Sequence, residues 1–155
     1  MRTRIGPLHL DDVTATEALA ARLAPVLGAG DTLLLSGPIG AGKTALSRAL
    51  IRARLGNPAE DVPSPTFTLV QTYSDGETEI WHADFYRLSS PDEVVELGLD
   101  EAFETAICLI EWPDRLGELT PRDALHITLA ALEDGHEISF AGSADWTQRL
   151  ETVLD

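Results

Sequence analysis

The clearest chemistry in the sequence lies in a glycine-rich segment that reads GPIGAGKT, residues 37–44. It matches the pattern G-x-x-x-x-G-K-[ST], in which glycines let successive backbone N–H groups turn inward and cradle an anion. The lysine would reach the β- and γ-phosphates of a nucleoside triphosphate, and the final hydroxyl would hold Mg²⁺. The residues expected to bind the phosphates are Gly37, Gly40, Ala41, Gly42, Lys43 and Thr44.

Lys43 is the only lysine among eleven basic residues, the other ten being arginines. A compact ammonium group can reach between phosphates, where the broader guanidinium group of arginine is a poor substitute. The alternative is a glycine turn that begins a helix and binds nothing. The motif, its place between an expected strand and an expected helix, and the solitary lysine together favour a phosphate site.

Glu111 is the first candidate for the carboxylate that a triphosphate site needs to hold its metal. It directly follows the apolar run ICLI, a pattern typical of a buried strand that ends on a metal-binding acid. We therefore expect Thr44 and Glu111 to hold Mg²⁺ together. Glu111 could instead close the strand and cap the next turn.

Asp84 and Thr66 are the remaining candidates for catalytic roles. Asp84 would share a strand face with His82, from which it could orient water or assist the metal. These two side chains could equally bond to each other, or to Tyr86 and Arg87. Thr66 closely follows two prolines and could offer its hydroxyl to the γ-phosphate or to Mg²⁺. An ordinary threonine at the entry of a strand fits the sequence equally well.

Alternating helices and strands must position these groups. A buried strand is expected directly before the glycine loop and a helix directly after it. Two Asp-Gly dipeptides, at residues 75–76 and 134–135, are typical of hairpin turns. The expected helices cover residues 13–27, the loop to Leu55, residues 91–98 and the segment after Ser143. The expected strands cover residues 32–36, 66–73, 77–83, 106–110, 124–132 and 136–141.

The order of these elements predicts the fold class. A strand, a glycine loop and a helix followed by further strands indicate an α/β domain of three layers, as in P-loop nucleoside triphosphatases. The two hairpins would make the central sheet mixed and partly antiparallel. With 155 residues, 44% of them hydrophobic, the chain is expected to form a single domain over residues 1–155.

Charge and composition exclude several other classes of function. A formal net charge of -15 argues against unaided binding to DNA or RNA, because such affinity comes mainly from basic residues that neutralise phosphates. No apolar run reaches the roughly 20 residues of a membrane-spanning helix. The first residues lack the apolar core of a signal peptide. We therefore expect a soluble cytoplasmic protein whose one cysteine, Cys108, is buried in an apolar run.

Four motifs together resemble the TsaE family, also called YjeE. They are GxxGAGKT in the glycine loop, SPTFTLV at residues 64–70, HADFYRL at residues 82–88 and LIEWPDRL at residues 109–116. They occur in that family's order and are far more specific together than the glycine loop alone. One departure is Pro38, where the family commonly has aspartate. Since proline lacks an N–H, we expect altered rigidity of the loop and retained binding.

The resemblance implies a small bacterial ATPase needed to make threonylcarbamoyladenosine in tRNA. Such proteins work with TsaB and TsaD, while TsaC supplies the activated threonylcarbamoyl adenylate. ATP, ADP and Mg²⁺ would be the cofactors, and Glu111 would be a metal ligand. Thr66 and Asp84 would lie in switch-like segments, Trp112 close to the nucleotide, and Thr16 near its base. Hydrolysis would be weak in the isolated chain, and the acidic protein would meet tRNA only through the TsaB–TsaD assembly.

Three other classes of function remain open from the residues alone. A P-loop small-molecule kinase would need an acceptor pocket and usually an arginine-bearing lid, but no arginine cluster is visible in the sequence. A regulatory GTPase commonly has an Asn-Lys-x-Asp signature, and no lysine remains to build one. A scaffold that binds nucleotide without turnover would differ from the ATPase in showing no stimulation of hydrolysis by TsaB and TsaD.

Overall fold

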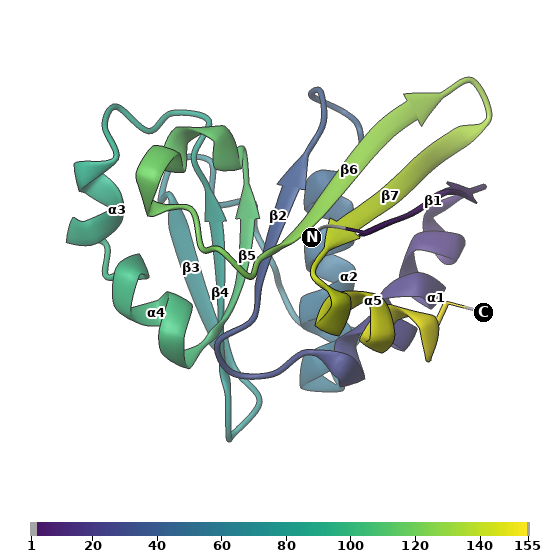
Figure 1. The fold of residues 1–155 in the computed structure, drawn as a ribbon, viewed down its shortest axis with the longest axis horizontal. Coiled ribbons are helices and arrows are strands. Elements are labelled where there is room, and N and C mark those ends of the chain that lie inside the picture. Colours follow the sequence, from purple (N-terminus) through teal and green to yellow (C-terminus); the bar gives the residue numbers. More distant parts are fainter. Residues whose placement is uncertain (1–2, 155) are drawn as a thin grey trace.

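The computed structural model describes residues 3–154 and arranges them around one seven-stranded sheet (Figure 1). The strand order is β1-β7-β6-β2-β5-β4-β3. The strands are β1 (Thr3–Leu10), β2 (Thr32–Ser36), β3 (Val70–Ser74), β4 (Glu79–Asp84), β5 (Ile107–Glu111), β6 (Leu125–Leu132) and β7 (Gly135–Gly142). The α-helices are α1 (Val13–Leu23), α2 (Lys43–Leu55), α3 (Asp92–Glu96), α4 (Leu99–Thr105) and α5 (Ala144–Glu151). Two short 3-10 helices are η1 (Ala24–Val26) and η2 (Pro113–Leu119).

Helices cover both faces of the sheet, which confirms the three layers expected from the sequence. On one face, α1, α2 and α5 contribute Leu23, Leu50 and Leu150 to a common apolar core. On the other face, α3 and α4 contribute Val94 and Ala102 to a second core. Figure 1 shows α3 and α4 gathered apart from α1, α2 and α5. None of the helices within residues 3–154 combines the length and the apolar character needed to cross a bilayer.

The sheet is mixed, as the two Asp-Gly turns predicted. β2 pairs in parallel with both β5 and β6, and β4 pairs in parallel with β5. The hairpins β3–β4 and β6–β7 are antiparallel, and so is the pair β1–β7. The carboxyl ends of β2, β5 and β4 therefore meet at one edge of the sheet, where open α/β sheets bind their ligands.

The segment around Thr66 differs from the expected strand. β3 begins only at Val70, because residues 66–69 form a turn. Leu69 has a left-handed φ of 68°, and its N–H donates to the carbonyl of Pro65 at 2.7 Å. Thr66 therefore lies in a tight turn before the strand, and the prediction that it opens a strand was wrong.

Three elements were not expected from the sequence. β1 was missed because Gly6 and Pro7 interrupt its pattern, and its register against β7 shifts between Ile5 and Leu8. Proline is tolerated there because β1 is an edge strand. α4 and η2 were also missed. Gly98, expected to end a helix, takes a φ of 86° and leads directly into α4.

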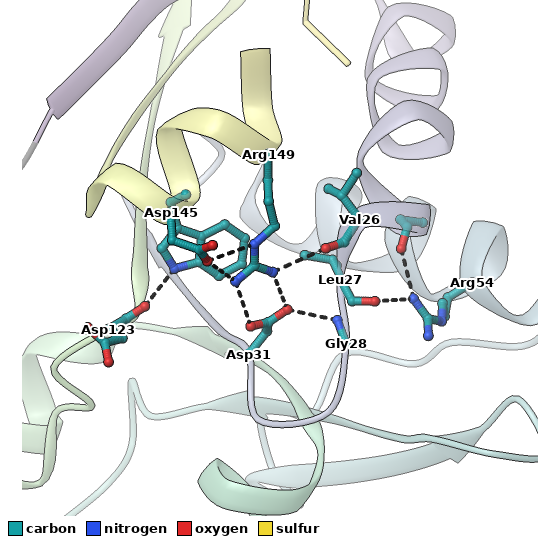
Figure 2. Close-up of polar contacts among 10 residues, drawn as sticks. Val26, Leu27, Gly28, Asp31, Arg54, Asp123, Asp145 and Arg149 are labelled. Carbon is teal, nitrogen blue, oxygen red and sulfur yellow. Dashed lines mark hydrogen bonds and ion pairs between the residues drawn. The ribbon is translucent and has the colours of Figure 1, made fainter. Parts of the chain in front are cut away.

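Arg149 fastens α5 to the turn between η1 and β2 (Figure 2). Its guanidinium group donates to both carboxylate oxygens of Asp31, at 2.6 and 3.2 Å, and to the carbonyl of Val26 at 3.1 Å. Asp145, one helical turn earlier, also accepts from Arg149 at 2.7 Å. Asp31 in turn accepts the backbone N–H of Gly28 at 2.7 Å. Because these bonds are charge-assisted, they hold the last helix firmly against the turn that leads into the central strand.

Candidate functional site

The glycine loop connects β2 to α2 and leads directly into Lys43, the first residue of the helix. Gly42 is the N-cap, with a left-handed φ of 102° that other residues rarely adopt. Gly37 is required for a different reason, since a Cβ atom there would overlap the backbone carbonyl oxygen of Leu129 on β6. The loop thus joins a left-handed turn to the N-terminus of a 13-residue helix, a combination that favours anion binding.

The Lys43 ammonium group lies within the loop and is shielded from solvent. Its Nζ donates to the carbonyl oxygen of Gly37 and, at 3.1 Å, to that of Pro38. It also lies 3.9 Å from the ring centroid of Trp112. Burial lowers the pKa of Lys43 because desolvation penalises the charged form, while the negative charge of Glu111 opposes the shift. The ammonium group therefore already lies at the glycine loop, where it would bind the phosphates of a nucleotide.

Glu111 ends β5 with a side chain that is 2% exposed. Its two carboxylate oxygens have different partners: Oε1 accepts the Thr44 hydroxyl at 2.7 Å, and Oε2 lies 2.6 Å from Nε2 of His82. The parallel register of β4 and β5 places His82 opposite Leu109, two residues before Glu111. Thr44 and Glu111, the two expected metal ligands, are therefore in direct contact.

Asp84 ends the neighbouring strand β4, where its partner across the sheet is Glu111. Its Oδ1 accepts the backbone N–H of Tyr86 at 2.9 Å, and its Oδ2 accepts the Thr66 hydroxyl at 3.4 Å. Of the alternatives left open by the sequence, the bond to Tyr86 is present, while the His82 ring bonds to Glu111. Two expected catalytic residues, Asp84 and Thr66, are thus brought together.

Trp112 follows Glu111 in a left-handed conformation with a φ of 58°. Its ring meets that of Tyr86 edge to face, with centroids 5.0 Å apart, and also contacts the Lys43 ammonium group. Non-glycine residues in this conformation cost energy and cluster at functional sites. The turn after β5 therefore places an aromatic ring against the loop lysine.

These groups surround one cavity of about 550 Å³. Its size lies in the range of small-molecule and cofactor sites. Of the residues expected from the sequence, the cavity brings together Gly40, Ala41, Gly42, Lys43, Thr44, Thr66, Asp84, Glu111 and Trp112. Its walls also include residues that were not predicted as site residues, among them Ser64, Tyr86, Arg87 and His136.

The unpredicted wall residues differ in the signal that they left in the sequence. Ser64 lies in the SPTFTLV motif, and Tyr86 and Arg87 lie in HADFYRL, so each could have been inferred from its neighbours. His136 had no such signal. It belongs to β7 and reaches the loop only because the β6–β7 hairpin brings it against Gly42, where a Cβ atom would lie 3.6 Å from its ring.

Gly37 and Thr16 are expected site residues that do not line the large cavity. Gly37 instead accepts a hydrogen bond from Lys43. Thr16, on α1, lines a smaller neighbouring cavity of about 110 Å³. The walls of both cavities include Ala41, Gly42, Ala45 and His136, so Thr16 lies beside the glycine loop.

The donor set fits a divalent metal that takes few ligands from the protein. Within residues 3–154, no group of three or more His, Cys, Asp and Glu side chains is arranged to hold a metal by itself. The Thr44 hydroxyl and the Glu111 carboxylate are both hard oxygen donors, which suit Mg²⁺. Mg²⁺ usually keeps several waters and takes other ligands from substrate phosphates. The site therefore fits Mg²⁺ that arrives with a nucleotide.

Three exposed apolar side chains belong to the walls of the large cavity or lie next to wall residues. Ile39 and Tyr86, both walls of the cavity, are 77% and 43% exposed, and Phe67 is 83% exposed. The guanidinium group of Arg87, another wall residue, lies 5.0 Å from the Phe67 ring centroid. Exposed apolar side chains beside a functional site offer a surface for contact with another protein. We call Ile39, Phe67 and Tyr86 the apolar rim.

Comparison with known proteins agrees with this geometry. A protein from Bacillus subtilis named tRNA threonylcarbamoyladenosine biosynthesis protein TsaE is 39% identical over 127 residues, which cover 81% of this chain and 78% of the relative. A protein of the same name from Rickettsia felis is 37% identical over 131 residues, which cover 84% of this chain and 76% of the relative. The crystal structure of YdiB from Bacillus subtilis superposes with a TM-score of 0.75 at 29% identity, covering 99% of this chain and 93% of that one.

The structural neighbour confirms the P-loop nucleoside triphosphatase fold expected from the sequence. The same comparisons give no support to the small-molecule kinase alternative. The model of the family described as "Threonylcarbamoyl adenosine biosynthesis protein TsaE" matches residues 10–138. Since this match spans most of the chain and includes the glycine loop, Asp84 and Glu111, the chain belongs to the TsaE family.

Proposed function

We propose that this chain binds ATP and ADP with Mg²⁺ in the 550 Å³ cavity and hydrolyses ATP. The observation that carries the proposal is the contact of 2.7 Å between the Thr44 hydroxyl and the Glu111 carboxylate. In P-loop nucleoside triphosphatases, the hydroxyl after the loop lysine and a carboxylate at a strand end hold the same metal ion. Here two such side chains, 67 positions apart, meet beside the glycine loop.

The glycine loop would hold the phosphates. Its backbone N–H groups, at Gly40, Ala41 and Gly42 in particular, would bind phosphate oxygens at the start of α2. Lys43 would exchange its bonds to the loop carbonyls for bonds to the β- and γ-phosphates, where its charge is needed. Mg²⁺, when bound through Thr44 and Glu111, would neutralise charge on the same phosphates.

Asp84 and Thr66 would act beside the γ-phosphate together with Glu111. Asp84 lies at the end of β4 next to Glu111, and both carboxylates line the cavity. A carboxylate at this place can orient the attacking water by accepting a hydrogen bond from it. The Thr66 hydroxyl donates to Asp84 at 3.4 Å, which would help to hold that carboxylate in place.

Trp112 and Thr16 would contact the rest of the nucleotide. The Trp112 ring lies in the wall of the cavity, and one of its partners is the ammonium group that would move to phosphate. Thr16 lies in the smaller cavity, which shares Gly42 and His136 with the larger one. We propose that Trp112 lies beside the bound nucleotide and that Thr16 approaches its base.

We further propose that hydrolysis serves the formation of threonylcarbamoyladenosine in tRNA, as the names of the relatives support. The protein would act on an assembly of TsaB and TsaD and meet tRNA only through it, because a net charge of -15 repels nucleic acid. The apolar rim supports contact with a protein partner near the nucleotide. We expect hydrolysis to be weak in the isolated chain, and such contact would explain why. We also propose that the chain works as a single domain.

Calorimetry and turnover measurements test these proposals in two steps. Titration of Mg·ATP and Mg·ADP into the wild type should release heat, and Lys43→Ala should abolish the binding of triphosphate. Hydrolysis should then increase when the TsaB–TsaD assembly is added. Heat without any such stimulation would identify a nucleotide-binding scaffold. The absence of heat for the wild type, alone and with the assembly, would refute nucleotide binding itself.

A further inference from the structure

His82 is a buried titratable residue whose role no sequence motif explained. Its side chain is 0% exposed, and its Nε2 lies 2.6 Å from Oε2 of Glu111, which is 2% exposed. Within residues 3–154, the other ring nitrogen, Nδ1, is buried without a hydrogen-bond partner. The polar atoms of the ring therefore make one hydrogen bond, to the carboxylate of Glu111.

The two oxygens of the Glu111 carboxylate have different partners. Oε2 bonds to Nε2 of His82 on β4, and Oε1 accepts from the Thr44 hydroxyl on α2. A strand and a helix thus each hold one oxygen of the carboxylate. If Oε1 binds Mg²⁺ in place of the hydroxyl hydrogen of Thr44, Oε2 can keep its bond to His82.

We infer that His82 is a positioning residue, which holds Glu111 by Oε2 so that Oε1 faces the Thr44 hydroxyl and remains available to the metal. The inference rests on the proposed Mg·ATP site. Groups that bond to metal ligands orient them, and their loss commonly costs 10- to 100-fold in metal affinity. Without His82, the carboxylate could rotate about its side-chain bonds and would hold Mg²⁺ less often in the productive orientation.

A purely structural role is the competing explanation. Buried polar pairs also contribute to folding, so the loss of His82 would lower the stability of the protein in either case. The two roles differ in the Mg²⁺ dependence of nucleotide binding, which only the positioning role changes. Cys108 provides the control for stability. It is buried on β5, three residues before Glu111, and packs in the core on the other face of the sheet.

The test measures the affinity for a non-hydrolysable ATP analogue by calorimetry over a range of Mg²⁺ concentrations. His82→Leu should raise the Mg²⁺ concentration that gives half of the maximal effect about tenfold, with unchanged affinity in the absence of metal. His82→Gln, whose amide nitrogen lies near the position of Nε2, should restore most of the wild-type response. Cys108→Ala should lose stability and keep the wild-type Mg²⁺ dependence.

The outcomes separate the inference from the proposed function. A wild type without Mg²⁺-dependent nucleotide binding would refute the proposed site. If the wild type shows Mg²⁺-dependent nucleotide binding and His82→Leu has the same Mg²⁺ dependence, only the role of His82 is overturned. If His82→Leu does not fold, His82→Asn replaces it, because its amide lies near Nδ1 and should fail to restore the response. Equal Mg²⁺ dependence for His82→Asn and His82→Gln would likewise overturn the inference.

Discussion

The hydroxyl of Thr44 lies 2.7 Å from Oε1 of Glu111, so the first turn of α2 and the end of β5 meet through one hydrogen bond. The contact follows from the strand order. β2 and β5 are parallel neighbours, and Leu35, next to the last residue of β2, is opposite Glu111. The glycine loop therefore leaves the sheet beside the carboxylate that ends the next strand, which is the edge where α/β sheets bind ligands.

Glu111→Gln should abolish turnover while the protein stays folded. The substitution keeps an oxygen that can accept from Thr44 but removes the charge that attracts Mg²⁺. We expect ATP hydrolysis in the presence of TsaB and TsaD to fall at least about 100-fold. Glu118→Gln removes the same charge from an exposed position on η2 and should have no effect on the rate. Normal hydrolysis by the Glu111→Gln variant would show that the metal assignment is wrong.

Gly37→Ala should be more destabilising than Gly40→Ala. Both residues have positive φ, at 147° and 83°, so both substitutions carry some backbone strain. Only at Gly37 would the new Cβ overlap a backbone atom, the carbonyl oxygen of Leu129, which cannot move without distorting β6. We expect a loss of about 3 kcal/mol or more for Gly37→Ala and about 1–2 kcal/mol for Gly40→Ala, measured by urea unfolding. Equal losses would contradict the close approach of the loop to β6.

Arg149→Ala should lower stability without changing nucleotide affinity. The substitution removes the guanidinium group that joins Asp31 and Asp145, and we expect a cost of about 2 kcal/mol. For a domain of this size, that cost corresponds to a fall in Tm of about 4–8 °C in a thermal scan. Arg115→Ala is the matched control, since its side chain is 47% exposed and its ion pair with Asp114 spans 3.9 Å. If the two variants have the same Tm, the hydrogen-bond network around α5 contributes nothing to stability.

Cys108 should make stability depend on pH in alkaline solution. Burial raises the pKa of its thiol from 9.0 to about 12. Between these values the unfolded chain loses the proton that the folded chain keeps, so the unfolded state binds fewer protons and stability falls as pH rises. Compared with Cys108→Ala, the wild type should lose about 1.4 kcal/mol of unfolding free energy between about pH 8 and pH 10. A difference between the two proteins that stays constant with pH would show that the thiol is not shielded.

The parts of the site that are contiguous in the chain were predictable from the sequence alone. The segment from Gly37 to Thr44 leads from a buried strand through the glycine loop into the first turn of a helix, and each step depends on local properties such as apolar runs, glycine conformations and helix caps. The same local rules located β4 and β5, together with the acids Asp84 and Glu111 that end them. They failed at β1, where a proline in an edge strand breaks the pattern that usually marks a strand.

The sequence by itself determined which groups could do chemistry: a phosphate-binding loop, one lysine, two acids at strand ends and a family resemblance. Only the tertiary structure decided which of them meet. The bond from His82 to Glu111, the bond from Thr66 to Asp84 and the approach of His136 to the loop all join segments distant in sequence. Such contacts depend on strand order and register, which result from apolar burial summed over the whole chain, so no local pattern encodes them.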